Sequence, residues 1–212
     1  MNSTRTPLIV DPSELVYPST QVAPQLLGCT LVRQLANGEQ IRGLIVETEA
    51  YEPNDPACHG YRRRTPRNAV MFSPAGVSYV YLIYGMYCCL NVVTDVEDVP
   101  SAVLIRALQL ESLPISMLVS LEQTQPLTSK QKIRLASGPG KLCRLLDINT
   151  QFNGLPLHPD QSLWLEHRTL AFQQRLEQQP NAIIQTTRIG LSQGQELPWR
   201  WYLGNCPSVS KV

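Results

Sequence analysis

The fold is indicated first by residues 29–51, which read CTLVRQLANGEQIRGLIVETEAY. Apolar residues recur at alternate positions on both sides of Asn37-Gly38, the dipeptide favoured in two-residue hairpin turns because both residues tolerate a positive φ. We therefore predict one strand from Cys29 to Leu35, a tight turn, and a return strand from Gln40 to Tyr51.

Similar patterns follow along the rest of the chain. Short apolar or alternating runs predict further strands at Val77–Ile83, Tyr87–Thr94 and Val103–Leu108, and others around Trp164, Ile184, Ile189 and Trp199. Helical segments are expected only at Pro18–Gly28, with Ser19 or Thr20 as its cap, and at Lys141–Leu146. Because strands outnumber helices, the expected class is α+β, with a curved and largely antiparallel sheet and a protruding hairpin.

The length of 212 residues suits one domain. We place that domain at residues 21–212 and expect residues 1–20 to form a flexible N-terminal arm. Residues 112–129, which are rich in Ser, Thr, Gln and Pro, are predicted to form a mobile internal loop. The proline-rich segment from Glu52 to Pro74 is long enough that a functional role is expected.

Composition excludes several classes of protein. The six cysteines form no C-x-x-C pair, so neither a zinc site nor a disulfide framework is expected. Gly140-Lys141 lacks the spacing of a phosphate-binding loop. No signal peptide and no apolar run of about 20 residues is present, so we expect a cytoplasmic protein with no metal, no cofactor and no membrane contact.

Positive charge is unevenly distributed although the net charge is only +1. Residues 56–94 contain four arginines but no Asp, Glu or Lys, and residues 123–146 contain five basic residues and no acid. The two stretches could form one positive face for nucleic acid, or an ordinary solvated surface.

Glu49 is the first candidate for chemistry. Strand alternation places Ile45, Glu47, Glu49 and Tyr51 on one face, next to the arginine-containing loop. These carboxylates either lie on a solvent-exposed edge, or one of them accepts a proton from an attacking water molecule, which is typically worth about 10²–10⁴-fold in rate.

Four tyrosines occur between Val77 and Tyr87. Tyr79 and Tyr81 share a strand face, whereas Tyr84 precedes Gly85 at the expected hairpin tip. An aromatic ring at an exposed tip suits a wedge that fills the gap left by a displaced nucleobase. His59, in the long loop, is either a surface residue or a stacking partner.

Taken together, these residues resemble the alkyladenine (3-methyladenine) DNA glycosylases of the mammalian methylpurine type. The resemblance begins near Pro24 and extends almost to the C-terminus. It rests on VETEAY at 46–51, TPRN at 65–68, YVYLIYGMY at 79–87, Asn91, LIRAL at 104–108, SGPGKL at 137–142 and RIG at 188–190.

The resemblance implies a single mixed α/β domain without a helix-hairpin-helix module. It implies a monofunctional enzyme without lyase activity that flips damaged purines out of double-stranded DNA and hydrolyses the N-glycosidic bond, leaving an abasic site. The substrates would be 3-methyladenine, 7-methylguanine, hypoxanthine and ethenoadenine. We expect a monomer associated with the nucleoid of a bacterial cell.

The same resemblance implies roles for individual residues. Glu49 matches the water-activating carboxylate, and Arg106 matches a residue near the catalytic water and the target phosphate. The residues matched to the base pocket are Tyr51, His59, Tyr81 and Asn91, of which Asn91 crowds the amino group of normal guanine. The residues expected to contact DNA are Tyr84, Met86, Arg63, Thr65 and Arg67. The segment between Glu49 and His59 is one residue shorter than in mammalian members.

Two other functions remain open on the residues alone. A non-catalytic nucleic-acid-binding module could share the fold, but it would need no carboxylate beside the tyrosines. A glycoside hydrolase could use Glu47 and Glu49 as its pair, but such pairs flank the scissile bond, whereas these two lie on one strand face.

Overall fold

The computed structural model describes residues 8–121 and 125–211, and its centre is strand β2 (Gln40–Tyr51). Strand β1 (Thr30–Gln34) pairs antiparallel with β2 through the turn at Asn37-Gly38, where Gly38 has a φ of +84°. The predicted hairpin is therefore confirmed, with β1 one residue shorter at each end than expected.

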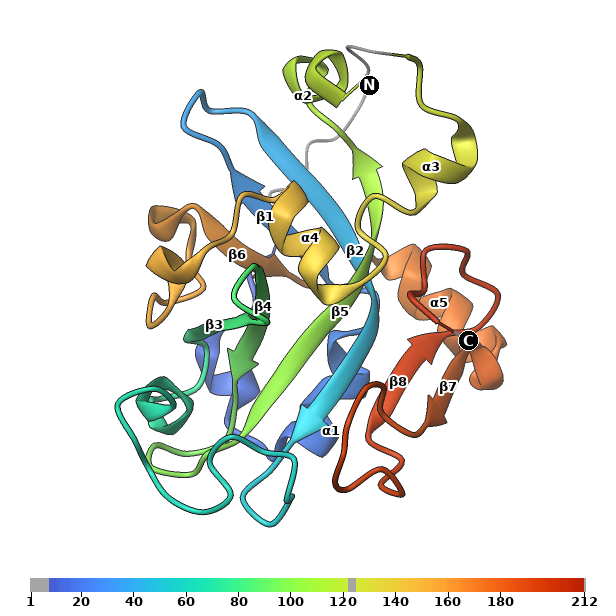
Figure 1. Ribbon diagram of the computed structural model, residues 1–212. Coiled ribbons are helices and arrows are strands. Elements are labelled where there is room, and N and C mark those ends of the chain that lie inside the picture. Colours follow the sequence, from blue (N-terminus) through green and yellow to red (C-terminus); the bar gives the residue numbers. More distant parts are fainter. Residues whose placement is uncertain (1–7, 122–124, 212) are drawn as a thin grey trace.

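One antiparallel sheet contains all eight strands of the described residues, with β3-β4-β5-β2-β1-β6 as its main path (Figure 1). Strand β8 pairs with β2 and with β7. The remaining strands are β3 (Ser78–Ile83), β4 (Tyr87–Val93), β5 (Ala102–Ser112), β6 (Leu163–Glu166), β7 (Ile183–Thr186) and β8 (Arg200–Leu203). The α+β prediction is confirmed, because the helices accompany one antiparallel sheet and do not alternate with parallel strands.

Strand β2 is paired along both of its edges. Strand β5 follows one edge, while β1 covers 40–44 and β8 covers 47–49 of the other. Glu47 and Glu49 thus lie on a central strand and not on an edge strand of the sheet.

Three register shifts interrupt the pairing of β2 with β5, and two of them flank Glu47. Ile45 faces Leu108 and Glu47 faces Ala107, so Val46 is an extra residue on β2. Glu47 faces Ala107 while Thr48 faces Ile105, so Arg106 is an extra residue on β5. Bulges of this kind redirect a side chain, and this one places Arg106 between the two glutamates.

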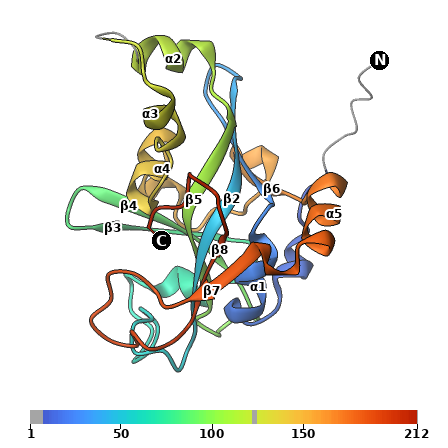
Figure 2. The same ribbon diagram turned by 90° about the vertical axis from the view of Figure 1, so that its right-hand side faces the viewer.

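Helices cover both faces of the sheet. Figure 2 shows α1 (Ser19–Leu26) and α5 (Leu170–Gln178) on one side and α3 (Ser129–Ile133) and α4 (Pro139–Leu145) on the other. Helix α2 (Ile115–Leu121) follows β5. Short 3-10 helices occupy Pro12–Leu15, Ala69–Phe72, Thr150–Phe152, Pro159–Gln161 and Pro180–Ala182.

Helix α1 shows how the sheet is anchored. Its buried residues are Ser19, Val22, Ala23 and Leu26, a spacing that forms a single helical stripe. The hydroxyl of Thr48 donates to the carbonyl of Ala23 at 2.9 Å. Thr48 therefore faces α1, and its neighbours Glu47 and Glu49 face the opposite side of the sheet.

The described part of the N-terminal segment contacts the domain, and the flexibility expected for residues 1–20 stays a prediction. Within the proposed arm, Val10 and Leu15 are buried and the backbone of Ile9 bridges to Glu166, so residues 8–20 pack onto the domain. The rest of the arm, 1–7, lies outside the described residues. Ser19 is the first helical residue rather than a cap, since its hydroxyl donates to the carbonyl of Tyr51.

Three other expectations need correction. The segment 112–129 contains helix α2, while its residues 122–124 lie outside the described part; its mobility stays a prediction. Residues 170–178 form α5, although only strands were expected there. Ile189 lies in a loop rather than a strand, and its backbone N–H donates a hydrogen bond to the side chain of Glu49.

The β3–β4 hairpin turns at Tyr84 and Gly85, which have φ values of +53° and +70°. Positive φ at both central residues is typical of the hairpin turns whose twist matches that of the strands. In Figure 2 this hairpin extends away from the sheet toward the side that is the front of Figure 1.

Gly28 is predicted to be essential for stability. Its φ is +85°, and a Cβ there would lie 2.1 Å from the ring of Phe172, so Gly28→Ala combines backbone strain with a severe overlap. We expect a loss of about 3 kcal/mol or more in the free energy of unfolding, measured by urea denaturation.

Gly38→Ala is the matched control, since Gly38 has nearly the same φ but nothing within 4 Å of the added atom. It should cost only about 1–2 kcal/mol. Equal losses in the two variants would show that the contact with Phe172 does not matter.

Candidate active site

The candidate site lies where β2 ends, on the face opposite α1. Glu47 and Glu49 are both 0% exposed. The interpretation of this strand face as a solvent-exposed edge is therefore wrong, because β5 and β8 enclose both edges of the strand.

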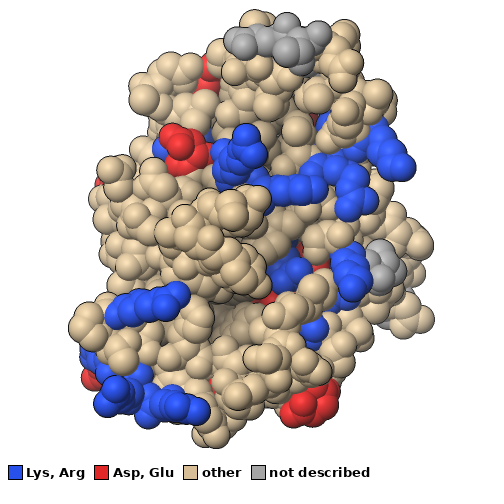
Figure 3. All heavy atoms as spheres, viewed as in Figure 1, with Lys and Arg blue, Asp and Glu red and all other residues tan. Residues whose placement is uncertain are grey.

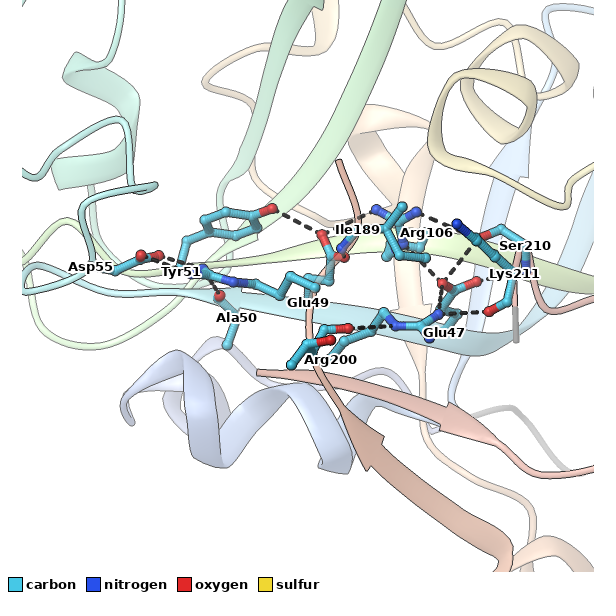
Figure 4. Close-up of polar contacts among 12 residues, drawn as sticks. Glu47, Glu49, Ala50, Tyr51, Asp55, Arg106, Ile189, Arg200, Ser210 and Lys211 are labelled. Atoms are coloured by element: carbon cyan, nitrogen blue, oxygen red, sulfur yellow. Dashed lines mark hydrogen bonds and ion pairs between the residues drawn. The ribbon is translucent and has the colours of Figure 1, made fainter. Parts of the chain in front are cut away.

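Glu49 is held by donors from three segments (Figure 4). Its Oε1 accepts from the backbone N–H of Ile189 at 2.8 Å. Its Oε2 accepts from the hydroxyl of Tyr51 at 2.9 Å and lies 3.1 Å from Nη1 of Arg106. A carboxylate offers about four acceptor positions, so among the described residues one position of Glu49 is left for a further donor.

Glu47 has a different environment from Glu49. It accepts from Nε of Arg106 at 2.9 Å and from Nη1 of Arg200 at 2.8 Å. The backbone N–H and the hydroxyl of Ser210 donate to it at 2.7 and 2.9 Å. Three of these donors share its Oε1 and one contacts its Oε2, so Glu47 ties β2 to β8 and to the C-terminal segment.

Arg106 forms ion pairs with both Glu47 and Glu49, because the bulge in β5 directs its side chain between them. Burial disfavours its charge, but the Glu49 and Glu47 carboxylates outweigh this and raise the pKa of Arg106. Its guanidinium therefore stays charged and contacts both carboxylates. Burial and the adjacent Glu49 likewise raise the pKa of Tyr51, which remains a neutral phenol and a hydrogen-bond donor.

A second buried ion pair lies beside Tyr51. Arg188 contacts Asp55 through both terminal nitrogens, with the Nη2–Oδ1 distance at 2.8 Å. It also donates to the carbonyls of Ala50 at 2.9 Å and Gly194 at 3.1 Å. The pair thus connects the long loop after β2 with the segment that carries Ile189.

A pocket of about 360 Å³ opens beside these groups. Its lining includes the predicted pocket residues Tyr51, His59, Tyr81 and Asn91, together with Tyr79, Tyr84 and Arg67. The structure therefore brings together all four residues expected to surround a base.

The aromatic walls of the pocket contact one another. The ring of His59 lies 4.6 Å from that of Tyr81, centroid to centroid, at an interplanar angle of 68°. Its Nδ1 is hydrogen-bonded to the hydroxyl of Tyr79 at 2.8 Å. Partial burial and the charge of Arg67 lower the pKa of His59, so the ring is neutral at neutral pH. Asn91 is fixed by donating to the carbonyl of Tyr79 at 3.0 Å.

The residues expected to contact DNA lie outside the pocket or at its rim. Tyr84 and Met86 at the hairpin tip are 81% and 69% exposed, a large apolar exposure for a turn. Arg63, Thr65 and Arg67 line a neighbouring depression of about 460 Å³. Asn68, whose amide donates to the carbonyls of His59 and Arg63, holds this loop in place.

Figure 3 shows two groups of basic side chains on the face toward which the hairpin points, one over the 52–74 loop and one over α3. The first group includes Arg62, Arg63 and Arg67. The second includes Lys130, Arg134, Lys141 and Arg144. The basic stretches noted in the sequence therefore share one face, with the hairpin between them.

Sequence reasoning gave no role to several residues of the site. These are Asp55, Tyr79, Arg188, Arg200 and Ser210. One signal was present: Asp55 is the last acid before the long acid-free stretch that contains the arginines. The partners of the others lie too far along the chain for local patterns to reveal.

Residues 8–121 and 125–211 contain neither a cluster of metal-binding side chains nor a membrane-spanning helix. No group of three or more His, Cys, Asp or Glu side chains in these ranges is placed to hold a metal ion. No helix there has the length and apolar character needed to cross a membrane.

Comparison with known proteins gives a consistent family. The family model described as "Methylpurine-DNA glycosylase (MPG)" matches residues 14–207. A protein of Trichodesmium erythraeum named "Putative 3-methyladenine DNA glycosylase" is 56% identical, over 96% of this chain and 98% of its own length. Proteins of the same name from Synechococcus sp. (strain JA-3-3Ab) and Carboxydothermus hydrogenoformans are 50% and 43% identical, each over at least 90% of both chains.

The role of Glu47 as a buried anchor leads to a stability prediction. Glu47→Gln leaves Arg106 and Arg200 short of a counter-charge, and removing one partner of a buried ion pair typically costs about 3–5 kcal/mol. We expect a loss of that size in the free energy of unfolding by urea.

The control is Asp98→Asn, which breaks the exposed pair with Arg64. Exposed pairs contribute about 1 kcal/mol or less. If Glu47→Gln cost no more than Asp98→Asn, the assignment of Glu47 as the anchor would fail.

Proposed function

The chain belongs to the methylpurine-DNA glycosylase family and is a DNA glycosylase of base-excision repair; we propose that it flips damaged purines into the aromatic pocket and hydrolyses their N-glycosidic bond with water that Glu49 deprotonates. The observation that carries this proposal is the remaining acceptor position of Glu49, a buried carboxylate beside a pocket lined by Tyr51, His59 and Tyr81.

The reaction balances with Glu49 as the only proton acceptor. The oxygen of water forms a bond to C1′ of the sugar while the C1′–N bond breaks. The electron pair of the C1′–N bond leaves with the base. The proton of the water passes to Glu49, so that the products are a free base and an abasic site. Arg106, in contact with Glu49, holds the carboxylate in place.

Cationic bases suit this site best. Alkylation at N3 or N7 gives the purine a positive charge, so the base leaves without being protonated first. A cation stacked between Tyr51, His59 and Tyr81 gains roughly 0.5–2 kcal/mol from the aromatic faces. His59 can take part because its lowered pKa keeps the ring uncharged.

Neutral damaged bases, such as hypoxanthine and ethenoadenine, complete the proposed substrate range. They can stack in the same pocket, but their departure needs a proton. Normal guanine is excluded in this proposal by Asn91, whose hydrogen bond to the Tyr79 carbonyl fixes it where the exocyclic amino group would lie.

We also propose hydrolysis without a lyase step. A glycosylase with lyase activity forms a Schiff base between an amine and the sugar. Among the described residues that line the pocket there is no lysine. Water activated by Glu49 is therefore the nucleophile in this proposal.

Contact with duplex DNA is assigned to the face shown in Figure 3. The two basic groups would each lie near a stretch of phosphates, with Tyr84 entering the minor groove between them. Extruding a nucleotide costs a few kcal/mol, and an aromatic ring in the vacated space would offset part of that cost.

The two rival functions are less well supported. Glu47 is held by Arg106, Arg200 and Ser210 and does not line the pocket, which leaves Glu49 without a second carboxyl for glycoside hydrolysis. A binding module would gain nothing from burying Glu49 next to the pocket, since an ionised carboxylate disfavours DNA contact.

Glu49→Gln is expected to abolish base release while retaining DNA binding. The amide keeps the size of the side chain but cannot accept the proton, so single-turnover excision of 7-methylguanine should fall by at least about 10²-fold. Alkali-labile abasic sites measure the excision, and a fluorescence anisotropy titration measures the binding.

The control is Glu97→Gln, the same substitution at an exposed position. It should leave both quantities unchanged. Normal excision by the Glu49→Gln variant would disprove the role of Glu49.

Tyr84→Ala should weaken base flipping. Losing a stacked ring worth about 1–3 kcal/mol per base should reduce single-turnover excision by about tenfold or more, whereas Tyr84→Phe should remain near the wild type. A base-analogue fluorophore opposite the lesion reports the flipped state. Equal excision by the Ala and Phe variants would exclude the wedge.

A further inference from the structure

We propose that the buried Asp55–Arg188 pair sets the preference of the pocket for positively charged bases, with Asp55 cancelling a cation that lies directly behind the ring of Tyr51. This inference rests on the proposed function and adds a specificity-determining pair, neither member of which touches the base.

The placement of Arg188 is the first observation. Its guanidinium carbon lies 4.7 Å from the centroid of the Tyr51 ring and 5.3 Å from that of Trp199, and its side chain is 0% exposed. Tyr51 lines the pocket, whereas Arg188 does not. One face of the ring therefore covers the guanidinium, and the other is left for the base.

The charge of Arg188 is permanent. Burial disfavours it, but hydrogen bonding to Asp55 and the charge of Asp55 outweigh burial and raise the pKa of Arg188. Asp55 is itself 0% exposed and contacts both terminal nitrogens of the guanidinium. The other partners of Arg188 are the neutral carbonyls of Ala50 and Gly194, so Asp55 is its direct counter-charge.

The surrounding charges do not replace Asp55. Glu47 and Glu49 are engaged by Arg106 and Arg200, so the six buried side chains together carry three positive and three negative charges. Arg67 at the pocket rim adds a positive charge. Without Asp55, the walls and floor of the pocket would carry an excess of positive charge.

The consequence depends on the charge of the base. A cationic purine stacked about 3.5 Å above Tyr51 would lie roughly 8 Å from the guanidinium carbon, since the ring separates them. At that separation, and at an effective dielectric constant of about 20, uncompensated repulsion would weaken binding on the order of tenfold to thirtyfold. A neutral purine of the same shape would feel almost none of this, so Asp55 governs the ratio of the two affinities.

The test compares affinities for two duplexes, one with a single 7-methylguanine and one with a single hypoxanthine. All proteins carry Glu49→Gln, so that no base is released during the titration. The titration is run at pH 6.5, where 7-methylguanine keeps its N1 proton and therefore its positive charge. The variants added to this background are Asp55→Asn, Arg188→Gln and the double change, which give the pair net charges of +1, −1 and 0. Thermal unfolding of each variant is measured alongside.

The preference for 7-methylguanine should follow the charge of the pair. Asp55→Asn should reduce the ratio of affinities at least about tenfold, Arg188→Gln should raise it, and the double variant should return to within about threefold of the parent. A pair that only supports the fold would lower both affinities together and leave their ratio unchanged, which would overturn the proposal.

The design stays decisive if Asp55→Asn does not fold. The comparison then uses the Arg188→Gln variant and the double variant, which differ from each other only in the charge at position 55. Equal ratios of the two DNA affinities in these variants would overturn the proposal. Failure of the wild type to release any methylated base would instead contradict the proposed function, because the affinity ratio does not depend on chemistry.

Discussion

The structure depends on one buried network of six charged side chains at the end of β2. Its members are Glu47, Glu49, Asp55, Arg106, Arg188 and Arg200, all of them at most 7% exposed. Removing an ion from water costs several kcal/mol even after the protein relaxes, so such groups are stable only when each is paired and hydrogen-bonded. The pairing explains features that look unrelated in the chain: the bulge that redirects Arg106, the course of the segment that carries Ile189, and the return of the C-terminus to β2 through Ser210.

The network also divides two chemically identical carboxylates between two tasks. Glu47 and Glu49 are two residues apart and equally buried, yet Glu47 receives four donors and Glu49 three. Glu47 is held by two arginines and Ser210, whereas Glu49 accepts from the hydroxyl of Tyr51, a residue of the pocket wall. Glu49 is therefore the carboxylate proposed to orient the water molecule. The environment rather than the residue type sets the role, as it does wherever two carboxyl groups of one site act differently.

This division marks how far the sequence alone could lead. Asn37-Gly38 and the alternation from Gln40 to Tyr51 are short-range signals, and the hairpin they predict is present. Burial of Glu49 could not be foreseen, because the strand that closes the edge of β2 begins about 150 residues later at Arg200. The same holds for Asp55 and Arg188, which are 133 residues apart.

Helix α5 was not predicted, because its apolar residues at every third or fourth position, here Phe172 and Leu176, lie in a region that also contains strands. The resemblance to a family supplied what local patterns could not, since it named Arg106 without any knowledge of the bulge.

The charge state of the pocket walls points to where the enzyme concentrates its electrostatic effect. Tyr51 stays neutral because its pKa is raised, His59 stays neutral because its pKa is lowered, and the cation behind Tyr51 is cancelled by Asp55. Apart from Arg67 at the rim, the described residues that line the pocket carry no charge. Neutral aromatic faces can bind a flat base without strongly favouring the bound ground state, and Glu49, the carboxylate proposed to activate water, is hydrogen-bonded to Tyr51 of the pocket wall. Interactions that are stronger in the transition state than in the bound substrate are the ones that accelerate a reaction. A charged wall would act on the bound base instead, and so in the proposed mechanism the neutrality of the walls matters as much as the carboxylate of Glu49.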